Sequence, residues 1–154
     1  MSKSLKRVTA ALVAAGHPPN IVETELARTA QQAADAIGCE LDQIVKSIIF
    51  RGEVSGKAVM FVTAGGNSVD PIKASAAAGE PLGKADATLI RAQTGFAIGG
   101  VSPIGHISPI LSFFDARLHD FDLVWAAAGT PNHVFGIEPT ILKNISTSQI
   151  IDFT

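Results

Sequence analysis

The sequence predicts an α+β fold in which a mixed, partly closed β-sheet or barrel is surrounded by helices. Three observations carry this prediction. Residues 45–64 read as a β-hairpin, and further short strands cluster between residues 110 and 137. The helices between them do not alternate regularly with strands, as they would in a parallel α/β protein. With 154 residues and no evident linker or repeat, we expect a single domain spanning residues 1–154.

The first predicted element is a helix over residues 5–15. Ser4 can cap its N-terminus and Gly16 can end it. The spacing of its apolar residues predicts one buried face, formed by Leu5, Val8, Leu12 and Ala15.

A strand, a helix and one helical turn follow. Residues 21–24 read as a short strand, and residues 30–37 as a helix capped by Thr29 and ended by Gly38. A further helical turn is expected at 41–44.

The predicted hairpin consists of strands 45–51 and 57–64 around a turn at 52–56. Its strands are rich in β-branched and aromatic residues, and the turn contains two glycines.

Two helices come next, at 72–78 after Pro71 and at 87–94 before Gly95, and then a short extended piece at 96–98. The remaining predicted elements are strands 110–115, 123–127 and 133–137, helix 139–144 and an edge strand at 149–153.

Composition narrows the functional class. Hydrophobic residues make up 47% and charged residues 17%, which excludes a disordered chain. The net charge is −2 and the isoelectric point is about 6.0, which argues against sequence-specific DNA binding. The apolar runs fall short of the roughly 18 residues of a membrane span. The single cysteine, Cys39, cannot form an internal disulfide and favours a cytoplasmic protein.

Lys46 is the first candidate functional residue. It heads an apolar strand and shares one face with Ile48 and Phe50, so its ammonium group needs a cleft or a polar partner. The alternative is a strand-end lysine whose stem packs while its head reaches water.

The second candidate is the irregular loop 99–106, which contains three glycines and Pro103. Such a loop can bring backbone amides close to a ligand oxygen. The alternative is a tight connection without function.

The third candidate is the turn 129–133, where Asn132 and His133 could point into a site or simply form a turn.

Conventional catalytic and cofactor motifs are missing from the sequence. His106, Asp115, His119 and His133 lack metal-ligand spacing, and neither nucleotide-binding glycine motif is present. Cys39 follows a helix C-terminus, which disfavours a thiolate. We therefore expect no metal, no cofactor and no protein nucleophile.

Together the three candidates resemble the YbaK and prolyl-tRNA-synthetase-associated editing domains. The matching segments are 43–50, 94–106 and 127–132, and their order and spacing fit over nearly the whole chain. Each motif is weak alone, but the joint match is fairly specific.

The resemblance implies a free-standing deacylase that hydrolyses the ester between a wrong amino acid and its tRNA, often tRNA for proline. It implies that Lys46 and the amides of Gly99, Gly100 and Val101 act in catalysis, with a water assisted by the terminal ribose hydroxyl. The implied partners are the acceptor end of an aminoacyl-tRNA and a tRNA synthetase. The implied substrate-binding residues are Ser102, Pro103, Gly105, His106, Gly129 and Asn132.

One position departs from the family pattern. Some relatives have serine before the glycine that corresponds to Gly129, whereas this chain has Ala128. The wrong amino acid therefore stays open among small residues. The alternative function is a non-catalytic module that binds a tRNA end or a nucleotide. The available phosphate-binding side chains are Lys3, Lys6, Arg7, Lys46, Lys84 and Arg91.

Overall fold

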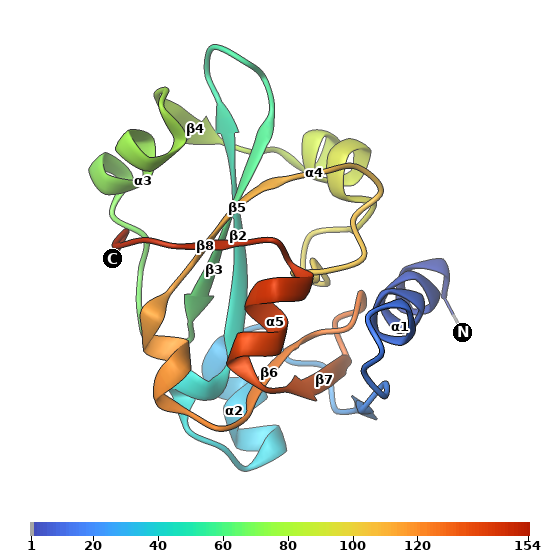
Figure 1. Ribbon diagram of the computed structural model, residues 1–154. Helices are drawn as coiled ribbons and strands as arrows, with labels where there is room; N and C mark the ends of the chain where they lie inside the picture. Colours follow the sequence, from blue (N-terminus) through green and yellow to red (C-terminus); the bar gives the residue numbers. More distant parts are fainter. Residues whose placement is uncertain (1) are drawn as a thin grey trace.

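The computed structural model describes residues 2–154 and arranges two β-sheets with helices outside them (Figure 1). One sheet has the strand order β1-β7-β6 and the other β4-β2-β3-β5-β8. The strands of the first sheet are β1 (Ile21–Glu23), β6 (Val124–Ala127) and β7 (His133–Ile137). Those of the second are β2 (Val45–Gly52), β3 (Ala58–Ala64), β4 (Leu82–Lys84), β5 (Leu111–Phe114) and β8 (Gln149–Ile150).

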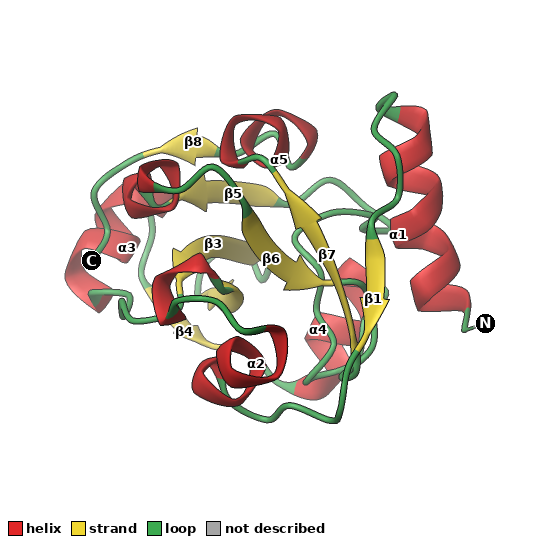
Figure 2. Cartoon of the chain, turned by 90° about the horizontal axis from the view of Figure 1, so that it is seen from below, coloured by secondary structure: helices red, strands yellow, loops and turns green. Residues whose placement is uncertain are grey.

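The helices lie around the strands, as Figure 2 shows from below. The α-helices are α1 (Lys3–Ala14), α2 (Ala30–Ile37), α3 (Pro71–Ala78), α4 (Ala87–Thr94) and α5 (Pro139–Ile145). Two 3₁₀ helices, η1 (Leu41–Gln43) and η2 (Ala116–Asp120), complete the elements. Every helix formed by residues 2–154 falls short of the length and apolar character that a membrane crossing requires.

The predicted mixed α+β class is confirmed, with two sheets in place of a closed barrel among the described residues. The β2–β3 hairpin is antiparallel, whereas β5 pairs in parallel with both β3 and β8. The two sheets meet at a bridge between Ile44 and Trp125. Within residues 2–154, β2 has no partner strand on this side between that bridge and Phe50, where β4 begins to pair with it. The sheets therefore diverge along the first half of β2.

Alternating side chains of β3 supply two separate cores. Met60 and Val62 face the larger core, which lies between the two sheets and also takes residues from α1 and α5. Val59 and Phe61 face the smaller core, which α3 and Phe153 cover. Every residue of β3 is buried, because both of its faces are packed.

Several sequence predictions need correction. Ser2, not Ser4, caps α1 by accepting a hydrogen bond from the Leu5 amide, and Ala15 is exposed. Residues 96–98 form no strand. The predicted edge strand at 149–153 shortens to β8, although it does lie at a sheet edge.

Two short elements were not predicted, β4 and η2. The sequence Leu-Gly-Lys of β4 has no strand signal of its own, and it becomes a strand because it pairs with Phe50–Gly52.

Candidate functional site

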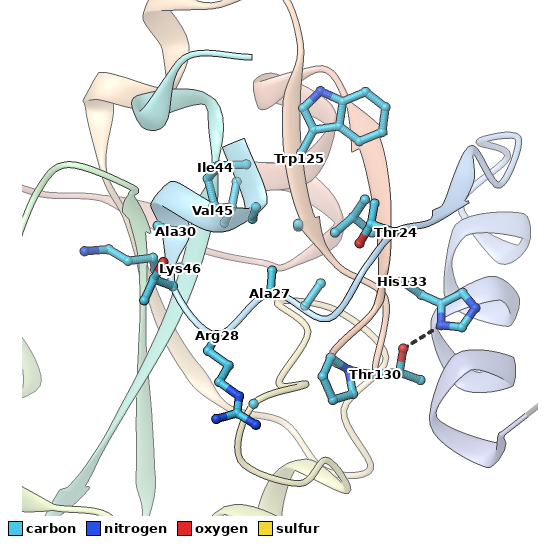
Figure 3. Close-up of a pocket in the computed structure, with 17 residues that line it drawn as sticks. Thr24, Ala27, Arg28, Ala30, Ile44, Val45, Lys46, Trp125, Thr130 and His133 are labelled. Atoms are coloured by element: carbon cyan, nitrogen blue, oxygen red, sulfur yellow. Dashed lines mark hydrogen bonds between the residues drawn. The ribbon is translucent and has the colours of Figure 1, made fainter. Parts of the chain in front are cut away.

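A cavity of about 150 Å³ lies where the two sheets diverge. Its walls come from the start of β2, from β6, from the turn before β7 and from the segment that leads into α2 (Figure 3). Lys46 and Gly99 both line it, so the structure brings two of the three sequence candidates to one place. The third candidate, the turn 129–133, contributes Thr130, Pro131 and His133 to the lining of the same cavity.

The walls of the cavity are mostly apolar and its rim is polar. Val45, Trp125 and Ala126 contribute apolar surface, while Arg28 and Thr24 bring polar groups from the segment before α2. Arg28 is exposed, and a cation at this place suits an anionic ligand. Arg28 is not among the candidates from the sequence, because residues 25–29 show no hydrophobic periodicity and no functional motif.

Lys46 lines this cavity, but its ammonium group binds a neighbouring turn. Its Nζ donates a hydrogen bond to the backbone carbonyl of Asn67, at 2.5 Å, and the side chain is half-buried. Figure 3 shows it leading away from the other labelled residues. The expected polar partner is therefore present, and it belongs to the turn after β3.

A buried carboxylate holds that turn in place. Asp115 accepts hydrogen bonds from the Ala64 amide at 3.0 Å and from the Asn67 side-chain amide at 2.9 Å. It also accepts one from the Arg117 amide at 3.0 Å. Because Asn67 binds Lys46 through its carbonyl and Asp115 through its side chain, the carboxylate fixes the partner of the lysine.

The Gly99–Pro103 loop presents its first residue to the cavity. Gly99 has φ of +94°, a conformation that glycine adopts without strain. Gly100 is buried against the 129–130 turn, where an added Cβ would lie 3.0 Å from the Thr130 Cα. Its amide already donates to the Ala97 carbonyl at 3.1 Å. Among residues 2–154, the amides of Gly99 and Val101 have no such backbone acceptor, and of these two residues only Gly99 lines the cavity.

The rest of the loop turns away from the cavity. Ser102 is fully buried, and its carbonyl accepts a hydrogen bond from His106 Nε2 at 2.7 Å. Pro103, Gly105 and His106 instead line a separate hollow next to the end of α5. Burial lowers the pKa of His106 below its ordinary value of 6.5; the bond to Ser102 opposes this shift, and the charge of Arg7 adds to it. A neutral imidazole with its proton on Nε2 fits this arrangement.

The 129–133 turn closes the other side of the cavity. Gly129 is buried against α1, where an added Cβ would lie 2.8 Å from the Ser4 carbonyl oxygen. Thr130 Oγ1 contacts His133 Nδ1 at 2.6 Å and donates to Asn132 Oδ1 at 3.2 Å. Asn132 thus serves the turn, and His133 lies on the cavity wall.

Residues suited to metal or thiol chemistry lie elsewhere. Residues 2–154 contain no group of three or more histidine, cysteine, aspartate or glutamate side chains that could hold a metal ion. Cys39 does not line the cavity, and burial raises the pKa of its thiol.

The aminoacyl-tRNA editing domain family matches residues 24–145 of this chain. YwhH of Bacillus subtilis (strain 168), described as uncharacterized, is 33% identical over 122 residues, which cover 79% of this chain and 77% of YwhH.

Two solved structures superimpose on the whole chain with a TM-score of 0.92. One is described as a proposed trans-editing enzyme for prolyl tRNA synthetase; it is 41% identical, and the match covers 100% of this chain and 98% of that one. The other, from work on epitope backbone grafting onto scaffold proteins, is 40% identical and matches over 100% and 99% of the two chains. These matches confirm the resemblance on which the sequence prediction rests, and the chain belongs to the aminoacyl-tRNA editing domain family.

Proposed function

We propose that this protein is a cytoplasmic deacylase that hydrolyses mischarged aminoacyl-tRNA. The substrate class is tRNA for proline, or a related tRNA, that carries a small wrong amino acid. The observation that carries the proposal is the shared cavity: in an editing domain, one small hollow contains Lys46, Gly99 and the turn before β7. The similarity to a proposed trans-editing enzyme for prolyl tRNA synthetase supports the choice of tRNA and of a synthetase as a partner.

The size of the cavity favours a small amino acid. Its volume of about 150 Å³ suits a small group, and apolar side chains form most of the wall. Editing is needed where a synthetic site meets a smaller competitor, because one methylene group changes binding by only about 1–3 kcal/mol. A cavity that excludes the correct, larger residue supplies the second selection.

The proposed reaction needs no protein nucleophile. A water oxygen attacks the ester carbonyl carbon, and the negative charge that develops on the carbonyl oxygen is stabilised by the amide of Gly99, which lines the cavity and has no backbone acceptor among residues 2–154. The adjacent ribose hydroxyl orients the water and relays its proton. The bond between the carbonyl carbon and the ribose oxygen then breaks, and that oxygen takes up the proton. The amide of Gly100 shapes the loop, since it already donates to Ala97.

Lys46 acts on the nucleic-acid side in this proposal. Lys46 lines the cavity while its ammonium group lies beside the Asn67 carbonyl, so it can bind a phosphate or ribose oxygen of the tRNA outside the aminoacyl site. The Asn67 carbonyl holds it in position before the substrate arrives.

The test is a deacylation panel with one tRNA for proline charged with alanine, cysteine, serine, threonine or proline. We expect turnover of at least one small wrong amino acid and none of proline. Lys46→Ala should lower kcat/KM by about 100-fold while its Tm stays within about 4 °C of the wild type. Lys57→Ala is the matched control, because Lys57 is an exposed lysine of the same hairpin.

Two outcomes would contradict the proposal. Binding of the charged tRNAs without turnover of any would favour the non-catalytic module. Equal activity of the Lys46→Ala and Lys57→Ala variants would remove the lysine from the mechanism.

A further inference from the structure

Arg7 of α1 binds both ends of residues 95–105, the segment that contains the Gly99–Pro103 loop and is called the glycine loop below. Its Nη2 donates a hydrogen bond to the Gly95 carbonyl at 2.5 Å, and its Nε donates to the Gly105 carbonyl at 3.3 Å. The guanidinium also lies 4.8 Å from the centre of the Phe96 ring. Gly95 and Gly105 bracket the Gly99–Pro103 segment, so one side chain fixes where this segment begins and ends.

The backbone of α1 also supports both loops that border the cavity. An added Cβ on Gly105 would lie 3.2 Å from the Arg7 carbonyl oxygen, and one on Gly129 would lie 2.8 Å from the Ser4 carbonyl oxygen. The approach at Gly129 excludes a side chain and the one at Gly105 is tighter than an ordinary contact, so the loops rest directly on the first two turns of the helix.

The position of α1 does not depend on these loop contacts. Leu5, Val8 and Leu12 are buried in the core between the sheets and hold the helix there. Helix α1 also lies outside residues 24–145, the part that matches the editing family. The contact from Arg7 to the loop is therefore a property of this chain that the family match does not describe.

We propose that Arg7 is a positioning residue that holds the Gly99–Val101 segment in place so that the Gly99 amide faces the ester carbonyl, an inference that rests on the proposed function. Arginine suits this role because its planar fork can donate to two carbonyls at once. A residue that attracts the tRNA by charge would instead keep its donors free in solvent, whereas Arg7 is half-buried and bonded to the loop.

The experiment compares Arg7→Met, Arg7→Lys and Lys6→Met. Methionine keeps contact with Phe96 but donates no hydrogen bond, and lysine keeps the charge but can bond to one carbonyl at a time. Lys6→Met is the matched control, because Lys6 is the neighbouring exposed cation on the same helix. We expect Arg7→Met to lower kcat by about 10- to 100-fold with KM within about threefold, and Arg7→Lys to fall between it and the wild type. Lys6→Met should keep the wild-type kcat.

Amide exchange gives a readout that is independent of activity. The amides of Gly100 and Ile107 are hydrogen-bonded to Ala97 and Thr94 at 3.1 and 3.2 Å. They should exchange about 10-fold faster in Arg7→Met than in Lys6→Met, while the amides of β3 exchange equally in both. If the wild type deacylates no substrate, the proposed function fails, and the exchange comparison still decides whether Arg7 holds the loop.

The proposal is overturned by either of two results. One is a variant without arginine at position 7 that keeps wild-type kcat and wild-type exchange of the loop amides. The other is an Arg7→Met variant whose KM rises while kcat stays unchanged, because that result assigns Arg7 to tRNA binding. Should Arg7→Met be unfolded at the assay temperature, Arg7→Lys gives the same comparison.

Discussion

At the scale of single residues, the site depends on groups that the substrate never touches. Asp115 is buried and accepts hydrogen bonds from two donors at the turn that binds Lys46, and from a third donor, the Arg117 amide of η2. Hydrogen bonds to a charged acceptor stabilise by about 1.5–3 kcal/mol, and their loss leaves buried donors unpaired. His106 plays a comparable part for the glycine loop, since its ring donates to the Ser102 carbonyl.

The titration of His106 predicts how stability changes with pH. Burial lowers the pKa of His106, so the folded protein binds fewer protons at this site than the unfolded chain. The contribution of His106 to the free energy of unfolding is fully present above pH about 6.5. It is lost as the pH drops below that value toward the lowered pKa of the folded state. Urea unfolding of the wild type between pH about 7.5 and 5 should show this loss.

A His106→Gln variant is the control for this measurement. Glutamine can donate to the Ser102 carbonyl but does not titrate, so the variant should lose less stability over the same range. The carboxyl of Asp42, whose pKa is lowered by its hydrogen bond from Arg117, keeps its charge throughout this range and loses its contribution only as the pH falls to about 4 and below. Identical pH slopes in the two proteins would show that His106 is not the group responsible.

At the scale of elements, local signals predicted most helices and the main strands. Helices α2 and α4 have the predicted bounds because Thr29, Gly38 and Gly95 act within one turn of each end. The strand β7 also agrees in both bounds. In contrast, β4 exists only through pairing with β2, and no property of its own three residues indicates a strand.

The candidate site was also predictable only in part, because local signals indicate residue types and not long-range contacts. Lys46 and Gly99 stand out by residue type, and they do line one cavity. The bond from Lys46 to Asn67 and the contact from Arg7 to the loop join segments 21 and 88 residues apart. Such contacts follow from the packing of the whole chain, so no local pattern in the sequence indicates them.

The close contact between α1 and the turn before β7 predicts different costs for the same substitution at two glycines. Gly38 has φ of +82° and free space around it, so Gly38→Ala should lower the free energy of unfolding by about 1–2 kcal/mol through its backbone conformation alone. Gly129 has φ of +96° and also meets the backbone of Ser4, so Gly129→Ala should cost about 1–3 kcal/mol more. Urea unfolding of both variants measures the difference, and equal losses would mean that α1 does not pack closely on this turn.

At the scale of the whole molecule, the two-sheet arrangement explains why the cavity exists. The sheets share a bridge at Ile44 and Trp125, and each is packed against the core between them. Past the bridge they separate, because β2 continues toward β4 while β6 runs on toward the turn at 129–133. The gap is bordered by α2 and by the glycine loop, which come from distant parts of the chain. A small site between the sheets therefore follows from the topology and does not require a second domain.

The charge of the whole molecule predicts how tRNA binding responds to salt. A net charge of −2 disfavours binding along a long stretch of nucleic acid, so recognition should involve the tRNA end and only a few phosphates. With about three phosphate contacts, log K should fall against log salt with a slope near −2 to −3, or about 20- to 60-fold between 50 and 200 mM salt. Titration of a non-hydrolysable aminoacyl-tRNA analogue at several salt concentrations measures this slope. The Lys46→Ala variant should reduce it by about one contact relative to Lys57→Ala. A slope of about −6 or steeper, with a loss of 10³-fold or more, would instead mean that the protein grips a long stretch of the tRNA backbone.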